Sequence, residues 1–320
     1  MIDDLAVRAR NLTIQYFGRA VGLYAPLYIS NYCDNLCLYC GFNQKQNIPR
    51  KKLLPAEIEK ECRALARTGL QNILILTGES RSHSPVSYIK EAVLAAGRHF
   101  PNISLEIYPL ETEEYRELFL AGADGVTIYQ ETYDRESYQK LHPAGKKKDF
   151  DYRFEAPARI ARAGMRRLSL GILLGLSDWR QDLKALFDHL RCLEKKYPGV
   201  EYSLSFPRLQ KVRGDSNDYC PVSDREMTEI IARTRLAFPR VGINLSTREP
   251  ADFRDRIFEF GVTRLSAGSL TSVGGYGRND DKGPGQFEVS DRRSLAEIKA
   301  MLVKKGYDPV ITDWRRIPNE

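Results

Sequence analysis

The sequence lacks several features that mark specialised classes of protein. No run of about 18 or more apolar residues occurs among the 320 residues, so no transmembrane helix is predicted. The first residues include two acids and no apolar core segment, which argues against a secretory signal. Six cysteines are too few for a disulfide scaffold. No Gly/Ser linker, low-complexity stretch or internal repeat divides the chain. We therefore expect a cytoplasmic globular protein with no membrane partner.

Positive charge is only mildly in excess. Lys and Arg number 49 against 42 Asp and Glu, a net charge of +7 that is spread along the chain, so no nucleic-acid partner is expected. The histidines are few: His83, His99, His142 and His189 are interpreted as surface or helix-edge residues rather than ligands. The run Lys146–Lys148 is typical of a solvated loop, and it could also guide anionic groups or an acidic electron-donor protein.

Short β-branched runs alternate with amphipathic helical segments along the whole chain. Most of the runs are apolar on both faces, as in parallel strands covered by helices. The eight predicted strands are 25–30, 72–76, 103–108, 125–129, 168–174, 201–206, 242–246 and 263–267. Among the helices, Ser223 and Glu226 form a capping box that opens 224–237. Cys62 lies on an apolar helical stripe and is interpreted as a core residue.

This alternation predicts an α/β protein, a single (β/α)8 TIM-type barrel. A doubly wound open sheet explains the alternation nearly as well, because strand count alone does not decide between the two. The expected organisation is an N-terminal helix over 1–24, the barrel over 25–305 and a tail over 306–320 that packs on the barrel. In either architecture, chemistry collects at the carboxyl ends of the strands. Polar residues follow all eight predicted strands, which indicates one large active-site mouth there.

Three cysteines stand close together after the first predicted strand. Cys33, Cys37 and Cys40 have the spacing C-x3-C-x2-C. Zinc sites usually have four ligands that arrive as two pairs, and no nearby His or fourth Cys completes such a set here. Three thiolates on one loop can instead hold three irons of a [4Fe–4S] cluster and leave the fourth iron open. A zinc knuckle and unligated buried thiols are the alternatives.

The loop from Tyr28 through Phe42, with its C-x3-C-x2-C spacing, resembles the cluster loop of the radical S-adenosylmethionine (SAM) enzymes. The similarity continues to about Trp314 through a series of short motifs. These are Gln130-Glu131-Thr132-Tyr133, Asp151-Tyr152-Arg153, Gly171 to Arg180, Ser205 to Arg208, Ser246 to Glu249 and Gly274-Gly275-Tyr276. The set is similar to the radical SAM aromatic amino-acid lyases, above all the tyrosine lyases of thiazole (thiamine) biosynthesis. The chain lacks the N-terminal extension associated with these lyases, and it has no later cysteine pair, which disfavours the lyases of hydrogenase-cofactor maturation.

The resemblance implies two cofactors, a [4Fe–4S] cluster on the three cysteines and SAM on its open iron. It assigns Tyr39 to the adenine, Glu79 to the methionine amine and Arg153 to the methionine carboxylate of SAM. It assigns Glu131 to the ribose. Two further residues, Gly171 and Gly175, would let the backbone approach the adenine closely.

For the substrate, the resemblance assigns Arg248 to a carboxylate, with Ser266 close by and Tyr28 near the amino group. The implied reaction is radical cleavage of the Cα–Cβ bond of L-tyrosine to 2-iminoacetate and p-cresol. Its implied partners are a flavodoxin or ferredoxin-like electron donor and thiazole synthase. Tryptophan, or tyrosine in another pathway, remains an alternative substrate. A zinc-knuckle module that binds RNA is the alternative of a different class.

Overall fold

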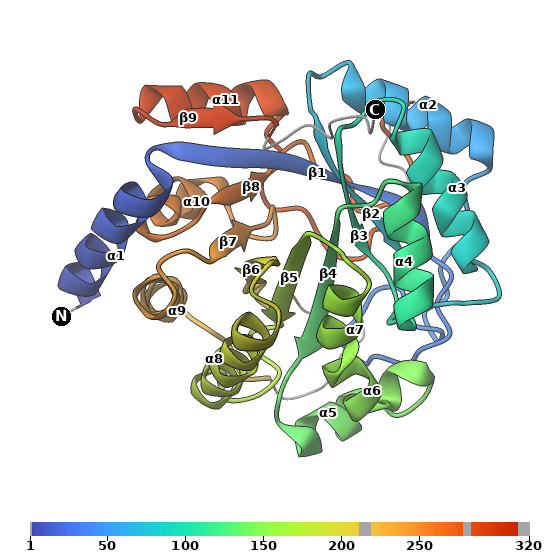
Figure 1. The fold of residues 1–320 in the computed structure, drawn as a ribbon, viewed down its shortest axis with the longest axis horizontal. Coiled ribbons are helices and arrows are strands. Elements are labelled where there is room, and N and C mark those ends of the chain that lie inside the picture. The colour runs from blue at the N-terminus through green and yellow to red at the C-terminus, as the bar shows by residue number, and fades with distance from the viewer. Residues whose placement is uncertain (1, 211–218, 278–282, 313–320) are drawn as a thin grey trace.

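The computed structural model describes residues 2–210, 219–277 and 283–312, and it is built around a closed ring of parallel strands (Figure 1). The ring runs in chain order from β1 to β8, and it closes because β1 pairs with both β2 and β8. The strands are β1 (Ala20–Ser30), β2 (Asn72–Thr77), β3 (Asn102–Glu106), β4 (Gly125–Glu131), β5 (Arg167–Ile172), β6 (Glu201–Ser205), β7 (Gly242–Leu245) and β8 (Arg264–Ser266). The closed barrel is therefore confirmed over the open sheet.

Helices cover the outside of this ring. They are α1 (Ile2–Phe17), α2 (Pro55–Ala66), α3 (Val86–Ala96), α4 (Thr112–Ala121), α5 (Arg135–Leu141), α6 (Phe150–Phe154), α7 (Ala156–Arg162), α8 (Trp179–Lys196), α9 (Asp224–Ala237), α10 (Ala251–Ile257) and α11 (Leu295–Lys304). Two short 3-10 turns, Lys146–Lys148 and Phe258–Phe260, join them. The predicted capping box at the start of α9 is present, with Ser223 and Glu226 in their expected roles. Within the described residues, no helix is long and apolar enough to cross a membrane.

The barrel begins earlier in the chain than expected, and the C-terminal tail adds a strand to it. β1 begins at Ala20 rather than Ala25, because its first residues pair with β8 and with a short strand β9 (Asp308–Val310). The segment 20–24 thus belongs to the sheet rather than to the N-terminal helix. The tail over 306–320 contributes β9, while its residues 313–320 lie outside the described residues. The division of the chain into domains otherwise stays a prediction.

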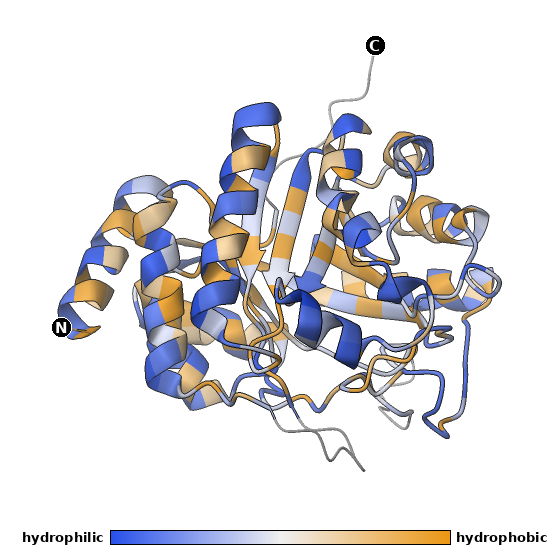
Figure 2. Cartoon of the chain, turned by 90° about the horizontal axis from the view of Figure 1, so that it is seen from below, coloured by the Kyte–Doolittle hydropathy of each residue, from blue (hydrophilic) through white to orange (hydrophobic). Residues whose placement is uncertain are grey.

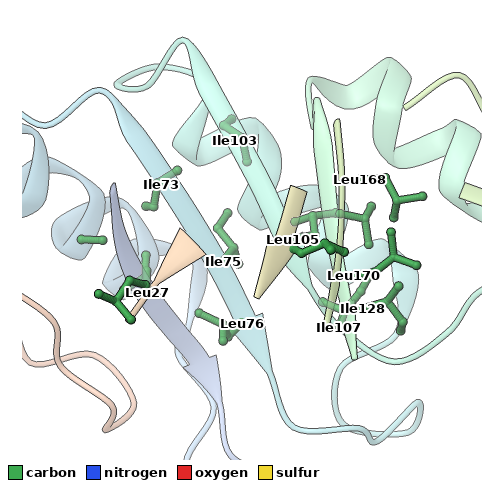
Figure 3. Packing of buried hydrophobic residues seen from close by; sticks show 14 of the residues in the cluster. Leu27, Ile73, Ile75, Leu76, Ile103, Leu105, Ile107, Ile128, Leu168 and Leu170 are labelled. Atoms are coloured by element: carbon green, nitrogen blue, oxygen red, sulfur yellow. The ribbon is translucent and has the colours of Figure 1, made fainter. Parts of the chain in front are cut away.

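The apolar core lies between the strands and the helices. Figure 3 shows Ile73, Ile75, Ile103, Leu105 and Leu168 on strands β2, β3 and β5, and all five are buried. The helices carry polar residues on one side and apolar residues on the other (Figure 2). Burial of this apolar surface is the main stabilising contribution to the barrel.

The inside of the barrel is unusually polar for this fold. Polar side chains on β1 and on β3 to β8 line one cavity, and β2 contributes Leu74 and Leu76 to it. The polar side chains include Tyr24, Ser104, Thr127, Ser169, Ser203, Asn244 and Ser266. Barrels of this type normally fill the interior with branched apolar side chains. Small polar residues leave space instead, so the interior of this barrel can admit a ligand.

Candidate active site

The cysteine loop is held at the carboxyl end of the barrel by two other segments. The backbone N–H of Asp34 donates to the carbonyl of Glu79 at 3.0 Å, and the Asn35 amide donates to the Glu79 carboxylate at 2.7 Å. Gly78 comes so close to this loop that a Cβ there would lie 2.3 Å from the carbonyl oxygen of Tyr32. The backbone N–H of Lys147 donates to the Asn35 side chain at 2.9 Å. The loop after β2 and the segment before α6 thus fix the shape of the cysteine loop.

Two connected hollows meet at this end of the molecule. The cysteine hollow is lined by all three cysteines together with Glu79 and Arg153. The barrel cavity runs down the inside of the strands and encloses about 1450 Å³ outside the protein atoms, open solvent at its mouth included. Both hollows share Tyr28, Cys40, Glu106, Glu131 and Lys147 in their linings, so they form one continuous space. A group held at the cysteine hollow would therefore face the barrel cavity directly.

The three predicted cluster ligands are free thiols that line one hollow. Burial raises the pKa of all three thiols, that of Cys33 to about 11, so they are protonated when no cation is bound. Iron coordination would displace these protons, as metal binding to thiols requires. Among the described residues, no three His, Cys, Asp or Glu side chains are arranged around a single metal ion. Three thiols of one loop are the donors that an iron–sulfur cluster takes, so these residues fit such a cluster.

Two ion pairs line the cysteine hollow. Arg153 donates to the Glu79 carboxylate at 2.9 Å and to the carbonyl of Tyr129 at 2.6 Å. The Lys147 ammonium donates to Glu131 at 2.6 Å and lies 4.0 Å from Glu79. Burial raises the pKa of Glu79, but the charges of Arg153 and Lys147 more than offset this, so that pKa lies below its ordinary value. Glu79 is therefore ionised at neutral pH.

Glu131 reaches the hollow through a distortion of its strand. Its backbone has φ of +72°, and the register of β4 against β5 shifts between Tyr129 and Glu131. Such bulges turn a side chain toward a site at the end of a strand. A strained conformation for a non-glycine residue is typical of functional sites.

Lys147 and His142 lie at positions that the sequence did not predict. Lys147 was interpreted as part of a solvated run, but its side chain is only 10% exposed and pairs with Glu131. His142 was interpreted as a surface or helix-edge residue, but it is fully buried. Its Nδ1 lies 2.7 Å from the carbonyl of Tyr138, and its Nε2 lies 2.7 Å from the Tyr39 hydroxyl. Burial lowers the pKa of His142 to about 2, so the neutral imidazole accepts from Tyr39 and orients this ring at the cavity.

The three predicted substrate residues all line the barrel cavity. The Arg248 guanidinium lies 3.7 Å from the centre of the Phe287 ring. The Tyr28 hydroxyl donates to Gln286 at 2.7 Å, and the Ser266 hydroxyl accepts from the backbone N–H of Thr247 at 3.0 Å. Arg208, a second arginine near this end, donates to Glu249 at 2.9 Å and to Asp224 at 2.8 Å. Arg208 is therefore already occupied by carboxylates, whereas Arg248 faces the cavity.

The two predicted adenine glycines are explained locally by protein contacts. A Cβ on Gly171 would lie 2.3 Å from the Tyr129 ring, so this glycine makes room for Tyr129. Gly175 has φ of +114°, a conformation that favours glycine, and it lines a separate hollow beside Leu209 and Arg208. The geometry does not bring either glycine to the cysteine hollow, and their contact with SAM stays a prediction.

Glu106 is a cavity residue that the sequence analysis missed. It ends β3, and its side chain lines both hollows. Burial and the charge of Glu131 raise its pKa to about 7. The alternation of side chains along a strand could have indicated Glu106. Ser104 lies inside the barrel, and Glu106, two positions later, must face the same way. An acid at an inward position of a buried strand is a candidate site residue.

Comparison with known proteins agrees with this site. Residues 27–190 match the family model of the radical SAM superfamily, and residues 205–308 match the biotin and thiamin synthesis associated domain. The superfamily uses a [4Fe–4S] cluster and SAM, the two cofactors that the resemblance implied.

Individual relatives extend this agreement over the whole chain. The chain is 40% identical over 314 residues to 2-iminoacetate synthase of Escherichia coli K12, covering 98% of this chain and 83% of that protein. It is 28% identical to 3-methylornithine synthase of Methanosarcina acetivorans, over 85% and 75% of the two chains. The [FeFe]-hydrogenase maturase HydG from Carboxydothermus hydrogenoformans superposes with a TM-score of 0.91 at 33% identity, over 98% of this chain and 72% of that one. The match to the family model, the identity over nearly the full length and the cysteine hollow all lead to the same conclusion. The chain belongs to the radical SAM superfamily and, within it, to the 2-iminoacetate synthase family.

Proposed function

We propose that this chain is a carbon–carbon lyase that cleaves the Cα–Cβ bond of L-tyrosine to give 2-iminoacetate and p-cresol. The observation that carries the proposal is the continuity of the two hollows, because Cys40 and Arg248 line the same cavity. A cofactor held by the cysteines and a carboxylate held by Arg248 would therefore meet inside the barrel. The near-full-length similarity to 2-iminoacetate synthase supports tyrosine as the substrate.

The residues around the cysteine hollow suit the parts of SAM. When bound and reduced, the cluster supplies an electron for cleavage of SAM to a 5′-deoxyadenosyl radical. Glu79 and Arg153 present an anion and a cation side by side, matched to the ammonium and carboxylate of the methionine part. Glu131 offers acceptor oxygens to ribose hydroxyls, and Tyr39 offers a ring, oriented by His142, to the adenine. Gly171 and Gly175 would line the path of the adenine.

The substrate end of the proposal rests on Arg248, Ser266 and Tyr28. The forked guanidinium binds both oxygens of a carboxylate and fixes its orientation. Ser266 and Tyr28 line the same cavity and would hold the head group of the amino acid against it. Enclosure within the barrel keeps bulk water from the reacting atoms.

We propose two protein partners and a location. The exposed Lys146 and Lys148 flank Lys147 on the segment that packs against the cysteine loop, so an acidic flavodoxin or ferredoxin-like donor bound there would lie near the cluster. The imine product reacts with water, and direct transfer to thiazole synthase would protect it. The cytoplasm supplies SAM and the reducing conditions that free thiols and a reduced cluster need.

An anaerobic product assay tests the proposed function. Enzyme reconstituted with iron and sulfide would be supplied with SAM and reductant, and L-tyrosine and L-tryptophan would be offered separately. We expect p-cresol and 2-iminoacetate, or the glyoxylate formed by its hydrolysis, from tyrosine only, as measured by mass spectrometry. Indolic products from tryptophan, with none from tyrosine, would refute tyrosine lyase activity.

A further inference from the structure

The charged residues of the two hollows divide into paired and unpaired groups. Glu79 pairs with Arg153, and Glu131 pairs with Lys147. Over residues 2–210, 219–277 and 283–312, neither Glu106 nor Arg248 has an ion-pair partner. Arg248 lies over Phe287, and Glu106 faces the cavity. One anion and one cation are thus left over in the same space.

Glu106 and Arg248 reach the cavity from opposite walls. β3 and the segment after β7 are four strands apart in a ring of eight, whichever way the ring is followed. In an eight-stranded barrel the interior is just wide enough for side chains to fill. Because Glu106 and Arg248 line one cavity from opposite walls, one small ligand can contact both of them. Their charges are close enough for Arg248 to lower the pKa of Glu106.

A zwitterion is the ligand that satisfies both charges at once. We infer that Glu106 binds the α-ammonium group of the amino-acid substrate while Arg248 binds its carboxylate, so that the two residues clamp the head group across the barrel. This inference rests on the proposed function and adds to it the residue that recognises the amine. It places the Cα atom between the two walls, near the hollow that the cysteines line.

The electrostatics of Glu106 agree with this role. Burial and the neighbouring charge of Glu131 raise its pKa to about 7, since no cation is paired with it among the described residues. An arriving ammonium supplies that cation and favours the ionised carboxylate. A charge-assisted hydrogen bond then forms inside the barrel, where such bonds are strong.

Three ligands separate the two ends of the clamp. L-tyrosine has both charged groups, tyramine has only the ammonium, and 3-(4-hydroxyphenyl)propanoate has only the carboxylate. Binding to the anaerobic enzyme, with its cluster and SAM in place, would be measured by calorimetry. We expect Glu106→Gln to weaken L-tyrosine and tyramine by about 10- to 100-fold and to leave the propanoate unchanged. Arg248→Lys should do the reverse, weakening L-tyrosine and the propanoate but not tyramine.

Two further variants serve as controls. Glu201→Gln removes a carboxylate that lines the same cavity on a different strand, β6, and should leave all three affinities at wild-type values. Glu106→Asp keeps the charge and should retain the preference for ligands that carry an ammonium, which also covers the case in which Glu106→Gln fails to fold. Equal weakening of all three ligands by Glu106→Gln would overturn the inference. The inference would also be overturned if Glu106→Gln weakened the binding of L-tyrosine but not that of L-phenylalanine, because Glu106 would then contact the phenol.

The inference and the proposed function fail separately. If the wild-type enzyme consumes an amino acid other than tyrosine, the proposed function fails, and the same three-ligand comparison is made with the amine and acid analogues of that amino acid. If the enzyme forms p-cresol but Glu106→Gln weakens the propanoate as much as L-tyrosine, the clamp fails and the lyase activity stands.

Discussion

Among individual residues, Arg248 is the one whose geometry the proposed reaction depends on most. Its guanidinium stacks on Phe287 and forms no ion pair with any described residue, so a bound carboxylate would be its charge partner. A lysine keeps the charge but lacks the fork that fixes both carboxylate oxygens. Misplacement of the reacting atoms by about 1 Å can cost about 100-fold in rate. We therefore expect Arg248→Lys to lose most Cα–Cβ cleavage while uncoupled SAM cleavage continues.

The measurement for Arg248 is the ratio of p-cresol to 5′-deoxyadenosine under reducing, oxygen-free conditions. It should fall sharply in Arg248→Lys, and Arg248→Ala should in addition raise the apparent KM for tyrosine. An unchanged ratio in Arg248→Lys would show that this residue does not orient the substrate. Arg208 would then be a poor alternative partner for the substrate carboxylate, because it already pairs with Glu249 and Asp224.

Residue types and spacing predicted part of the site but not its burial. The cysteine spacing, Glu79, Arg153 and Arg248 were found from motifs, and each lines a hollow at the barrel mouth. Lys147 and His142 were interpreted as surface residues, because a lysine run and a histidine before proline look polar and exposed in sequence. Their burial depends on how the segment between β4 and α6 folds over the cysteine loop. That is a tertiary contact with no local pattern in the sequence.

At the level of secondary structure, the elements around the site are tied together by a buried ion-pair network. Asp291 precedes α11 and pairs with Arg254 of α10, and it also accepts from Arg293 at 2.7 Å. The side chains of Arg254 and Asp291 are 1% and 0% exposed. Arg254 also donates to the backbone carbonyl of Ser266, at the end of β8. The network therefore positions the strand end that carries a proposed substrate residue.

We expect Asp291→Asn to lower the free energy of unfolding by about 3–5 kcal/mol, because it leaves a buried Arg254 without its counter-charge. Burial raises the pKa of Asp291, but hydrogen bonds from Arg293 and the charge of Arg254 lower it by more, so that this pKa lies below its ordinary value. A lowered folded pKa means that the ionised group stabilises the protein above the ordinary carboxyl pKa of about 3.9. This stabilisation is lost as pH falls through the folded value.

Urea denaturation of wild type and Asp291→Asn across pH 7 to 3 checks this expectation. The difference between the two free energies should be full near neutral pH and should shrink below about pH 4. Asp252→Asn is a matched control, because Asp252 is exposed and pairs with Arg256 one helical turn away. It should change stability by less than about 1 kcal/mol. A constant difference between wild type and Asp291→Asn at every pH would show that the carboxylate charge is not what stabilises α10.

Most elements were predictable because their signals are local. All eight strands were found to within a few residues, since a buried parallel strand is a short apolar run bounded by turn residues. The start of α9 was located at Ser223 because a capping box requires those residue types three positions apart. The early start of β1 was missed because its first residues are strand only through pairing with β8 and β9. Such pairing partners lie far away in the sequence.

At the scale of the whole molecule, closure of the barrel is what joins the cluster loop to the substrate residues. The sequence left the closed barrel and the open sheet as alternatives, because both alternate strands and helices. Pairing of β1 with both β2 and β8 brings Tyr28, at the end of β1, into the same cavity as Arg248 and Ser266. An open sheet would place the first and last strands apart. The site thus depends on the complete ring rather than on any one motif.

A bound cluster would affect the stability of the whole chain. Three thiols with raised pKa values share one hollow, and only a bound cation makes their thiolate forms favourable there. We expect anaerobic reconstitution to give about four iron and four sulfide per chain, with the brown absorption of iron–thiolate charge transfer. Replacement of Cys33, Cys37 or Cys40 by Ala should abolish this absorption, and removal of iron by a chelator should lower the Tm of the wild type, since a ligand bound only by the folded state stabilises it.

The other three cysteines are the matched controls for this experiment. Cys62 is fully buried in the core, and Cys192 and Cys220 are exposed. Cys192→Ala and Cys220→Ala should leave iron content, absorption and Tm unchanged, whereas Cys62→Ala should keep the cluster but lose some stability because it leaves a small cavity. Loss of the cluster in Cys220→Ala would identify a fourth protein ligand. The fourth iron would then have no open position for SAM, and SAM-dependent cleavage of an amino acid by this chain would no longer follow from the site.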